Sequence, residues 1–470
     1  MGNNGLVLGC LVLALGLTSC VTMTRNALFQ QADAGANDRD YARAARMLDG
    51  PDSKKYYGDK DQVLRYLDTG MLYQLGGQPD QSIKRLEEAD RLIDENYTKS
   101  VSNAVASFVL NDYQLEYFGE AYEDIYVNVF KAIDYIQLGR YEDAGVEIRR
   151  VNTKLNLLED KYGRFADSLN ASPTARGAVK PGRTEFHNSA LARYLSALLY
   201  RAENRPDDAA LDLRNLREAF ATQPNLFNFA VPKLDEAPQA PGTVRLSVLA
   251  FTGRSPLKRA NNLRINTLQN LIVISQQTED AAGNLEFTNM APLAFPGVEQ
   301  GYNFKAELPE MVLRPSRVTK IRVLVDGVPA GELSLIEKLD TIAHETFALS
   351  QTPIFFKTVI RTVTKGILTK KAKDAALQAA SSAGSLGTAL AFAGGLAADL
   401  AVDASEQADL RIARYFPGRA SVGEFDVAPG THTVSVEYFG PRGELLYRDP
   451  GVAKPYQAGG LNLFASFDLE

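Results

Sequence analysis

The chain has 470 residues, of which 45% are hydrophobic and 23% are charged, and its formal net charge is −6. This composition is typical of globular proteins and excludes disorder throughout the chain, and the length predicts two to three domains. Because the net charge is negative, no nucleic-acid partner is expected. Both cysteines, Cys10 and Cys20, lie in the first twenty residues, and the three histidines are scattered singly. The rest of the chain therefore lacks a disulfide framework and a thiolate metal site, and we expect no metal and no other cofactor.

The N-terminus carries a targeting signal. Residues 6–19 form an apolar stretch of signal-peptide length, which ends in the tetrad Leu17–Cys20 (Leu-Thr-Ser-Cys). This tetrad resembles the bacterial lipobox, in which a small residue precedes a cysteine that is acylated before cleavage. The resemblance implies a signal peptide over residues 1–19 and a mature protein held in the lipid membrane by acylated Cys20. Val21 follows where, in Gram-negative lipoproteins, an Asp signals inner-membrane retention, so the resemblance implies a lipoprotein of the outer membrane that faces the periplasm.

Residues 20–230 are predicted to form an all-helical domain, because apolar residues recur at three- and four-residue spacing. Three stretches that begin at Tyr66, Asn128 and Arg193 share one frame, in which small and large residues alternate. This alternation is typical of the tetratricopeptide repeat, where small residues let two antiparallel helices touch. Half of a further repeat is predicted at residues 40–44. The sequence therefore predicts a tetratricopeptide-like helical repeat array.

The first helix of each repeat is expected to face the concave side of this array. The residues that the frame places there form a mostly apolar candidate partner groove, consisting of Leu67, Met71, Gln74, Tyr126, Ile133, Gln137, Tyr194, Leu198 and Arg201. Lysines and asparagines that would clamp a terminal carboxylate are absent from this set. Two interpretations are open: the groove holds an apolar helix or strand of a partner protein, or the protein's own insertions and C-terminal half fill it.

Several segments are similar to a family of uncharacterised bacterial tetratricopeptide-like envelope lipoproteins. They are residues 117–123 (Tyr-Phe-Gly-Glu-Ala-Tyr-Glu), 147–152 (Glu-Ile-Arg-Arg-Val-Asn), 406–411 (Glu-Gln-Ala-Asp-Leu-Arg) and Phe416-Pro417. The resemblance covers most of the chain and implies an envelope lipoprotein without an established activity. The family pattern has a tryptophan soon after the Ala-Asp segment, whereas this chain has Ile412 and Ala413.

Four charged residues in these segments, Glu120, Glu123, Arg149 and Arg150, form a candidate polar cluster. Two interpretations are open for this cluster as well. The residues bind a partner, or they form ordinary ion pairs between adjacent helices.

A Pro-rich linker at residues 231–242 precedes a mainly β, sandwich-like domain at residues 243–470, so the predicted fold class is α+β. Alternating residues predict strands at 244–251 and 271–274, a hairpin over 320–336 that turns at Asp326-Gly327, and further strands over 424–470. His432 shares the apolar face of its strand with Val434, Val436 and Tyr438, which predicts a core imidazole.

A helical insertion at residues 340–415 interrupts this domain. Its part from 354 to 373 is a basic amphipathic helix that contains no acid and carries a four-spaced stripe of Lys357, Arg361 and Lys365, a type of helix that can lie on anionic membranes. A Gly/Ala-rich run follows at 375–398, and its low hydrophobicity favours a helical hairpin in solution over membrane insertion. Membrane contact through 354–398 is the alternative.

Catalytic motifs are missing from the sequence. It has no glycine-rich phosphate loop, no Gly-x-Ser-x-Gly and no His-Glu-x-x-His, so the protein is not predicted to be an enzyme. We expect a membrane-anchored periplasmic lipoprotein that acts as a scaffold for protein partners in a bacterial cell-envelope assembly. The alternatives are a membrane-active or pore-associated lipoprotein that uses segment 354–398 and, less favoured, an envelope hydrolase.

Overall fold

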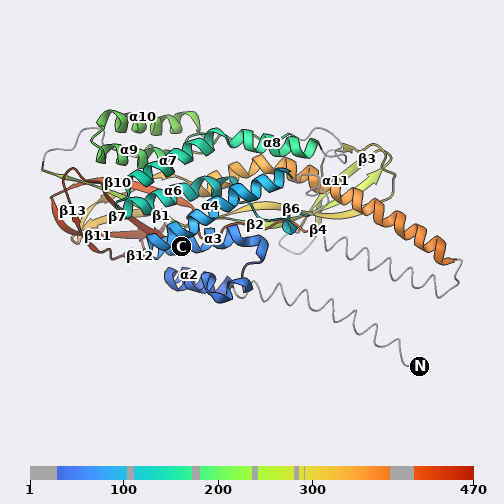
Figure 1. Ribbon diagram of the computed structural model, residues 1–470, viewed down its shortest axis with the longest axis horizontal. Helices are drawn as coiled ribbons and strands as arrows, with labels where there is room; N and C mark the ends of the chain where they lie inside the picture. The colour runs from blue at the N-terminus through green and yellow to red at the C-terminus, as the bar shows by residue number, and fades with distance from the viewer. Residues whose placement is uncertain are drawn as a thin grey trace, which may run out of the picture.

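The computed structural model describes residues 29–102, 111–171, 180–234, 242–279, 285–290, 292–381 and 407–470. In these ranges a helical N-terminal region is followed by a β-rich region with three sheets and one long helix (Figure 1). The predicted α+β fold class is therefore confirmed. Cys20 and most of the Gly/Ala-rich run lie outside the described residues.

The helical region consists of antiparallel helix pairs. The paired helices are α3 (Gln62–Leu75) with α4 (Pro79–Ser102), α6 (Ala121–Gln137) with α7 (Tyr141–Asn156), and α9 (Ala190–Ala202) with α10 (Pro206–Thr222). The remaining elements are α2 (Tyr41–Asp49), α8 (Leu158–Asn170) and three 3₁₀ turns, η1 (Pro51–Lys55), η2 (Asp59–Asp61) and η3 (Asp112–Gln114). Residues 29–37 form a helix next to α2, so a full helix pair stands where the sequence predicted half a repeat.

One backbone feature recurs at the turn inside each pair. Arg39, Gly77, Gly139 and Asn204 have φ angles of 62°, 68°, 74° and 57°, the left-handed conformation that ends an α-helix. Each of them stands five positions before a buried small residue of the second helix, and these residues are Ala44, Ser82, Ala144 and Ala209. The helix boundaries therefore agree with the predicted frame and extend it to a fourth pair.

The strands form three sheets. Sheet A has the order β14-β1-β10-β9, with β1 (Val244–Thr252), β9 (Ser334–Glu337), β10 (Arg419–Val427) and β14 (Asn462–Asp468). Sheet B has the order β4-β3-β2-β6, with β2 (Arg254–Leu268), β3 (Leu271–Glu279), β4 (Leu285–Asn289), β6 (Asn303–Arg314) and the short β5 (Leu293–Ala294) on β3. Sheet C has the order β12-β11-β7-β8, with β7 (Lys320–Val325), β8 (Val328–Glu332), β11 (Gly430–Phe439), β12 (Leu445–Asp449) and β13 (Ala453–Tyr456) on β11.

The predicted hairpin turn is present between β7 and β8. Asp326 and Gly327 have φ angles of 52° and 80°, as the tight turn of a hairpin requires. His432, predicted to lie in the core, is only half-buried, because it stands near the start of β11 at the end of its sheet. There its Nδ1 lies 2.6 Å from Oδ2 of Asp326.

Sheet A is the middle layer of the molecule. One face of β1, which includes Val244, Leu246 and Val248, packs against sheet C in a β-sandwich. The other face, with Leu249 and Phe251, belongs to the large core shared with the helical region. Because β1 is buried on both faces, six of its nine residues are apolar.

The long helix α11 (Leu339–Ser381) runs along sheet B (Figure 1). Its apolar face, with Val359 and Ile360, shares a core with Ile265 and Ile274 of sheet B. The predicted insertion therefore begins as a helix, but residues 407–415, at its end, are not helical. None of the helices in the described ranges is both long and apolar enough to cross a membrane.

Candidate functional site

The concave face of the helical array is covered by the rest of the chain. Seven of the nine residues predicted to line the partner groove are buried, whereas Gln137 is exposed and Arg201 half-buried. Tyr126 donates a hydrogen bond of 2.6 Å to Glu337 of β9, and the Phe130 ring lies 5.4 Å from that of Phe251 of β1. The interpretation that a partner-binding groove stays open along the whole array is therefore wrong. The apolar concave face packs against the second apolar face of sheet A, and the two faces form one core.

An extended segment, residues 407–416, also lies against the concave face, and we call it the strap. Arg411 of the strap donates hydrogen bonds of 2.7 Å and 2.9 Å to the carbonyl oxygens of Asp112 and Leu115. The backbone N–H of Ala413 donates to Glu123 of α6 at 2.6 Å, and that of Arg414 donates to Asp68 of α3 at 2.6 Å. A segment of the protein's own chain thus lies on the concave face, where the sequence left open whether a partner or the protein itself would bind.

The predicted polar cluster is not brought together. Glu120 pairs with Lys258 of β2, and Glu123 is buried against the strap. Arg150 instead pairs with Asp90 of α4 at 3.1 Å, and Arg149 is exposed. The interpretation as ordinary ion pairs between helices therefore describes Arg150, whereas Glu120 pairs with a residue of a strand.

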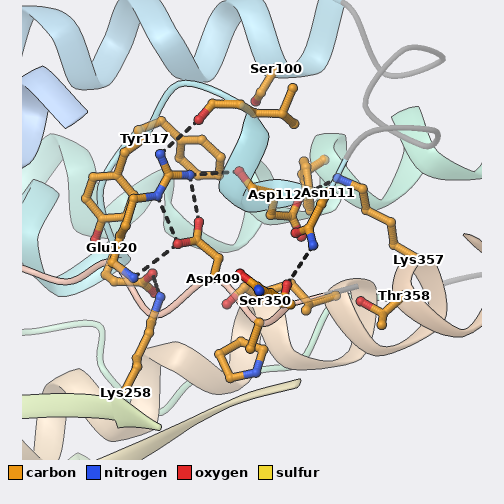
Figure 2. Close-up of a pocket in the computed structure, with 18 of the residues that line it drawn as sticks. Ser100, Asn111, Asp112, Tyr117, Glu120, Lys258, Ser350, Lys357, Thr358 and Asp409 are labelled. Atoms are coloured by element: carbon orange, nitrogen blue, oxygen red, sulfur yellow. Dashed lines mark hydrogen bonds and ion pairs between the residues drawn. The ribbon is translucent and has the colours of Figure 1, made fainter. Parts of the chain in front are cut away.

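A small cavity, the joint cavity, lies where α11, β2, η3 and the strap meet (Figure 2). Its volume is about 80 Å³, which is room for a few water molecules or one small group. Aromatic and aliphatic side chains form much of its wall, namely Leu115, Tyr117, Phe118, Tyr162, Phe165, Pro309 and Ile354. Its charged side chains include Asp112, Glu120, Lys258, Lys357, Arg361, Asp409 and Arg411.

The charges of the joint cavity pair with each other. Figure 2 shows Lys258 beside Glu120, while Lys357 pairs with Asp112. Burial alone would raise the pKa of Asp112, but the Lys357 ammonium outweighs it and holds that pKa below its usual range. Burial likewise opposes the charge of Lys258, but Glu120 keeps its pKa above the usual value. Lys258 therefore stays protonated and cannot serve as a general base.

Two residues of the predicted membrane-surface stripe, Lys357 and Arg361, line this cavity instead of facing outward. Lys357 and Arg361 are 1% and 4% exposed, and Lys365 is half-buried. Asp112, which pairs with Lys357, stands 245 positions away along the chain. The prediction that Lys357 and Arg361 contact a membrane is therefore wrong. Helical periodicity could not reveal this, because the carboxylate that pairs with Lys357 belongs to a distant segment.

A second, larger hollow remains open at the C-terminal end of the array, and we call it the terminal groove. It lies between α9, α10 and the edge of sheet A, where β14 is the last strand, and its volume is about 490 Å³. Two residues of the predicted groove, Leu198 and Arg201, line it. The other lining residues include Ala202, Ala209, Ala210, Leu213, Arg245, Ser247 and Asn462. Arg201 is held by Glu424 of β10 at 2.5 Å.

Comparison with models of protein families, with curated proteins and with solved structures finds no match. Within the described ranges, no group of three or more His, Cys, Asp or Glu side chains is placed to hold a metal ion. The assignment of a function therefore depends on the geometry of the molecule and on the sequence signals.

Proposed function

We propose that the protein is a lipoprotein of the bacterial outer membrane that faces the periplasm and acts as a scaffold in a cell-envelope assembly. In this proposal a protein partner binds in the terminal groove. The observation that supports it best is the groove itself, where the predicted concave face stays open while the strap and sheet A cover the rest.

The residues that line the terminal groove are better suited to binding a peptide segment than to catalysis. Small side chains such as Ala202 and Ala210 leave room for a partner's side chains, and Leu198 and Leu213 offer apolar contact. Tetratricopeptide arrays present such concave surfaces for binding. β14 adds a further feature, because the outer edge of a terminal strand carries backbone N–H and C=O groups that can pair with an extended peptide.

The membrane-active alternative has less support from the structure than it had from the sequence. Two residues of its basic stripe, Lys357 and Arg361, are buried and line the joint cavity. Most of the Gly/Ala-rich run lies outside the described residues, so its part in this alternative is not tested. Scaffolding is therefore the function that we carry forward.

The lipid anchor is tested by Cys20→Ala. Without the thiol no acyl chain can be attached, and we expect the protein to leave the membrane fraction or to accumulate as an uncleaved precursor. Fractionation of cells and the mass of the N-terminal peptide measure both effects. Unchanged cleavage and membrane retention would contradict the anchor.

The partner site is tested by photo-crosslinking in cells. A photoreactive residue at Ala202 or Ala210 faces the terminal groove, whereas one at the adjacent exposed Leu211 does not line it. We expect one defined adduct from the first two positions and none from the third, with the partner identified by mass spectrometry. The same adducts from all three positions would mean that contact is not specific to the groove.

A further inference from the structure

Three buried carboxyl groups lie where the helical region meets sheet A and the strap. They are Asp68 of α3, Glu123 of α6 and Glu337 of β9, with exposures of 1%, 0% and 0%. Each accepts a backbone hydrogen bond across this joint. The donors are the N–H groups of Arg414 for Asp68 at 2.6 Å, of Ala413 for Glu123 at 2.6 Å, and of Leu191 for Glu337 at 3.2 Å.

Each of these carboxyl groups also has a tyrosine partner. The hydroxyl of Tyr57 lies 2.8 Å from Asp68, that of Tyr117 lies 2.7 Å from Glu123, and that of Tyr126 lies 2.6 Å from Glu337. A hydroxyl can donate to an ionised carboxylate and, after rotation, accept from a protonated one. The tyrosine contact can therefore persist in both protonation states, and what differs between them is the buried negative charge of the ionised form.

No lysine or arginine side chain makes an ion pair with these three groups in the described part of the chain. Their hydrogen-bond partners there are neutral N–H and O–H donors. Most buried acids elsewhere are ion-paired, for example Glu147 with Lys131 at 2.9 Å. Asp134 of α6 is the exception among the described residues, because it is 0% exposed and makes no ion pair, but it lies inside the helical array beside Ser82 of α4. An ionised carboxylate without a cation is costly to bury, and such a group tends to take up a proton instead.

Charged neighbours act on two of these groups without forming an ion pair with them: Arg414 lowers and Asp33 raises the pKa of Asp68, and Glu120 raises that of Glu123. These neighbours are themselves paired. Near Asp68, the Arg414 guanidinium pairs with Asp33, to which Tyr415 also donates. Near Glu123, the Glu120 carboxylate pairs with Lys258. Near Glu337 and Tyr126, the Asp340 carboxylate lies 4.0 Å from Arg419.

We propose that Asp68, Glu123 and Glu337 form a proton-dependent clamp, which holds the helical region against sheet A and the strap when protonated and loosens when ionised. Geometry supplies the first argument, since all three groups bridge the joint without a cation. Burial supplies the second, because it raises the pKa of each group to about 7.

The sign of the pH dependence follows from linkage. Between the usual carboxyl pKa of about 4 and the raised pKa of about 7, the folded protein binds more protons than the unfolded chain. The contribution of these groups is therefore fully present below pH 4 and is lost as the pH rises through 7.

The test is the stability of the full chain between pH 5 and pH 8. We expect the urea midpoint to fall over this range, and we expect Glu337→Gln, Glu123→Gln and Asp68→Asn each to remove a part of the fall. Burial also raises the pKa of Asp134, so a further part of the fall remains when all three are replaced. Glu147→Gln is the matched control, a buried acid that is ion-paired, and it should lower the midpoint without flattening the pH dependence. A wild-type midpoint that is constant or rises from pH 5 to pH 8 would overturn the clamp.

Hydrogen exchange gives a second, local measurement that does not depend on any variant. After correction for the intrinsic pH dependence, the amides of Leu191, Ala413 and Arg414 should exchange at least about tenfold faster at pH 8 than at pH 6. Amides in the centre of α6 and α7 should show a smaller change. Equal changes at the joint and in the helix centres would mean that the whole fold responds to pH and that the joint is not a clamp.

Discussion

Small residues decide how closely the helices of each pair approach. At Gly70 of α3, an added Cβ would lie 2.5 Å from Cδ2 and 3.3 Å from the backbone N of Leu86, a fully buried residue of α4. No such contact exists at Gly163 of α8, where nothing lies within 4 Å of the added atom. Substitution of these two helical glycines by alanine is therefore expected to have opposite effects on stability.

Gly70→Ala should destabilise the protein by about 1–3 kcal/mol, because the methyl group overpacks a closed interface. Gly163→Ala should be neutral or stabilise it by up to about 1 kcal/mol, because alanine is the better helix former. Urea unfolding of both variants measures the difference. Equal effects at the two positions would contradict the assigned contact between α3 and α4.

At the scale of the elements, the position of α11 is explained by its buried charges and its apolar face. Its basic face is neutralised by the η3 region, and its apolar face covers sheet B. A helix with two opposite faces of this kind resembles a membrane-surface helix in sequence, although here protein covers both faces around Lys357 and Arg361.

Lys357→Glu should destabilise the fold by about 3 kcal/mol or more, because it places two carboxylates together in a buried site. Lys371→Glu, on the exposed part of the same helix, is the control and should change stability by less than about 0.5 kcal/mol. Thermal unfolding separates the two outcomes. Comparable stability of both variants would mean that Lys357 faces solvent.

Local periodicity predicted the elements whose pattern lies within one segment. The repeat frame agrees with the helix boundaries, and Asp326-Gly327 marked the β7–β8 turn. The strap could not be predicted, because its residues have no periodicity and their partners lie hundreds of positions away, as Asp61 does for Arg411. The roles of Lys258, Asp68 and Glu337 could not be predicted for the same reason. The resemblance of residues 406–411 and Phe416-Pro417 to a family pattern marked this segment without giving its contacts, and its arginines were a further signal, since buried arginines require acceptors.

A different set of buried acids should lose its contribution to stability in acid. Burial alone would raise the pKa values of Asp90, Asp112 and Asp124, but nearby lysines outweigh it and hold all three below the usual range. Groups of this kind stabilise the fold above pH 4, and their contribution is lost as the pH falls through their lowered pKa values.

Between pH 5 and pH 3 the contribution of these ion pairs falls while that of the three clamp groups rises, so the comparison of two proteins isolates the ion pairs. Asp124→Asn should have a lower urea midpoint than the wild type at pH 5, and the difference between the two midpoints should narrow at pH 3, because the variant lacks one of the three ion-paired acids. A difference that is unchanged or larger at pH 3 would contradict the ion pairs assigned to Asp124.

At the scale of the molecule, the strap and sheet A leave the terminal groove as the open part of the concave surface. A direct measurement is to fill this groove while probing it. Ala210→Trp places a ring in the hollow of about 490 Å³, and a photoreactive residue at Ala202 reports contact beside it. We predict that the Ala202 adduct disappears in the Ala210→Trp protein while thermal stability and membrane fractionation stay unchanged. An adduct of undiminished yield in that protein would contradict partner binding in the terminal groove.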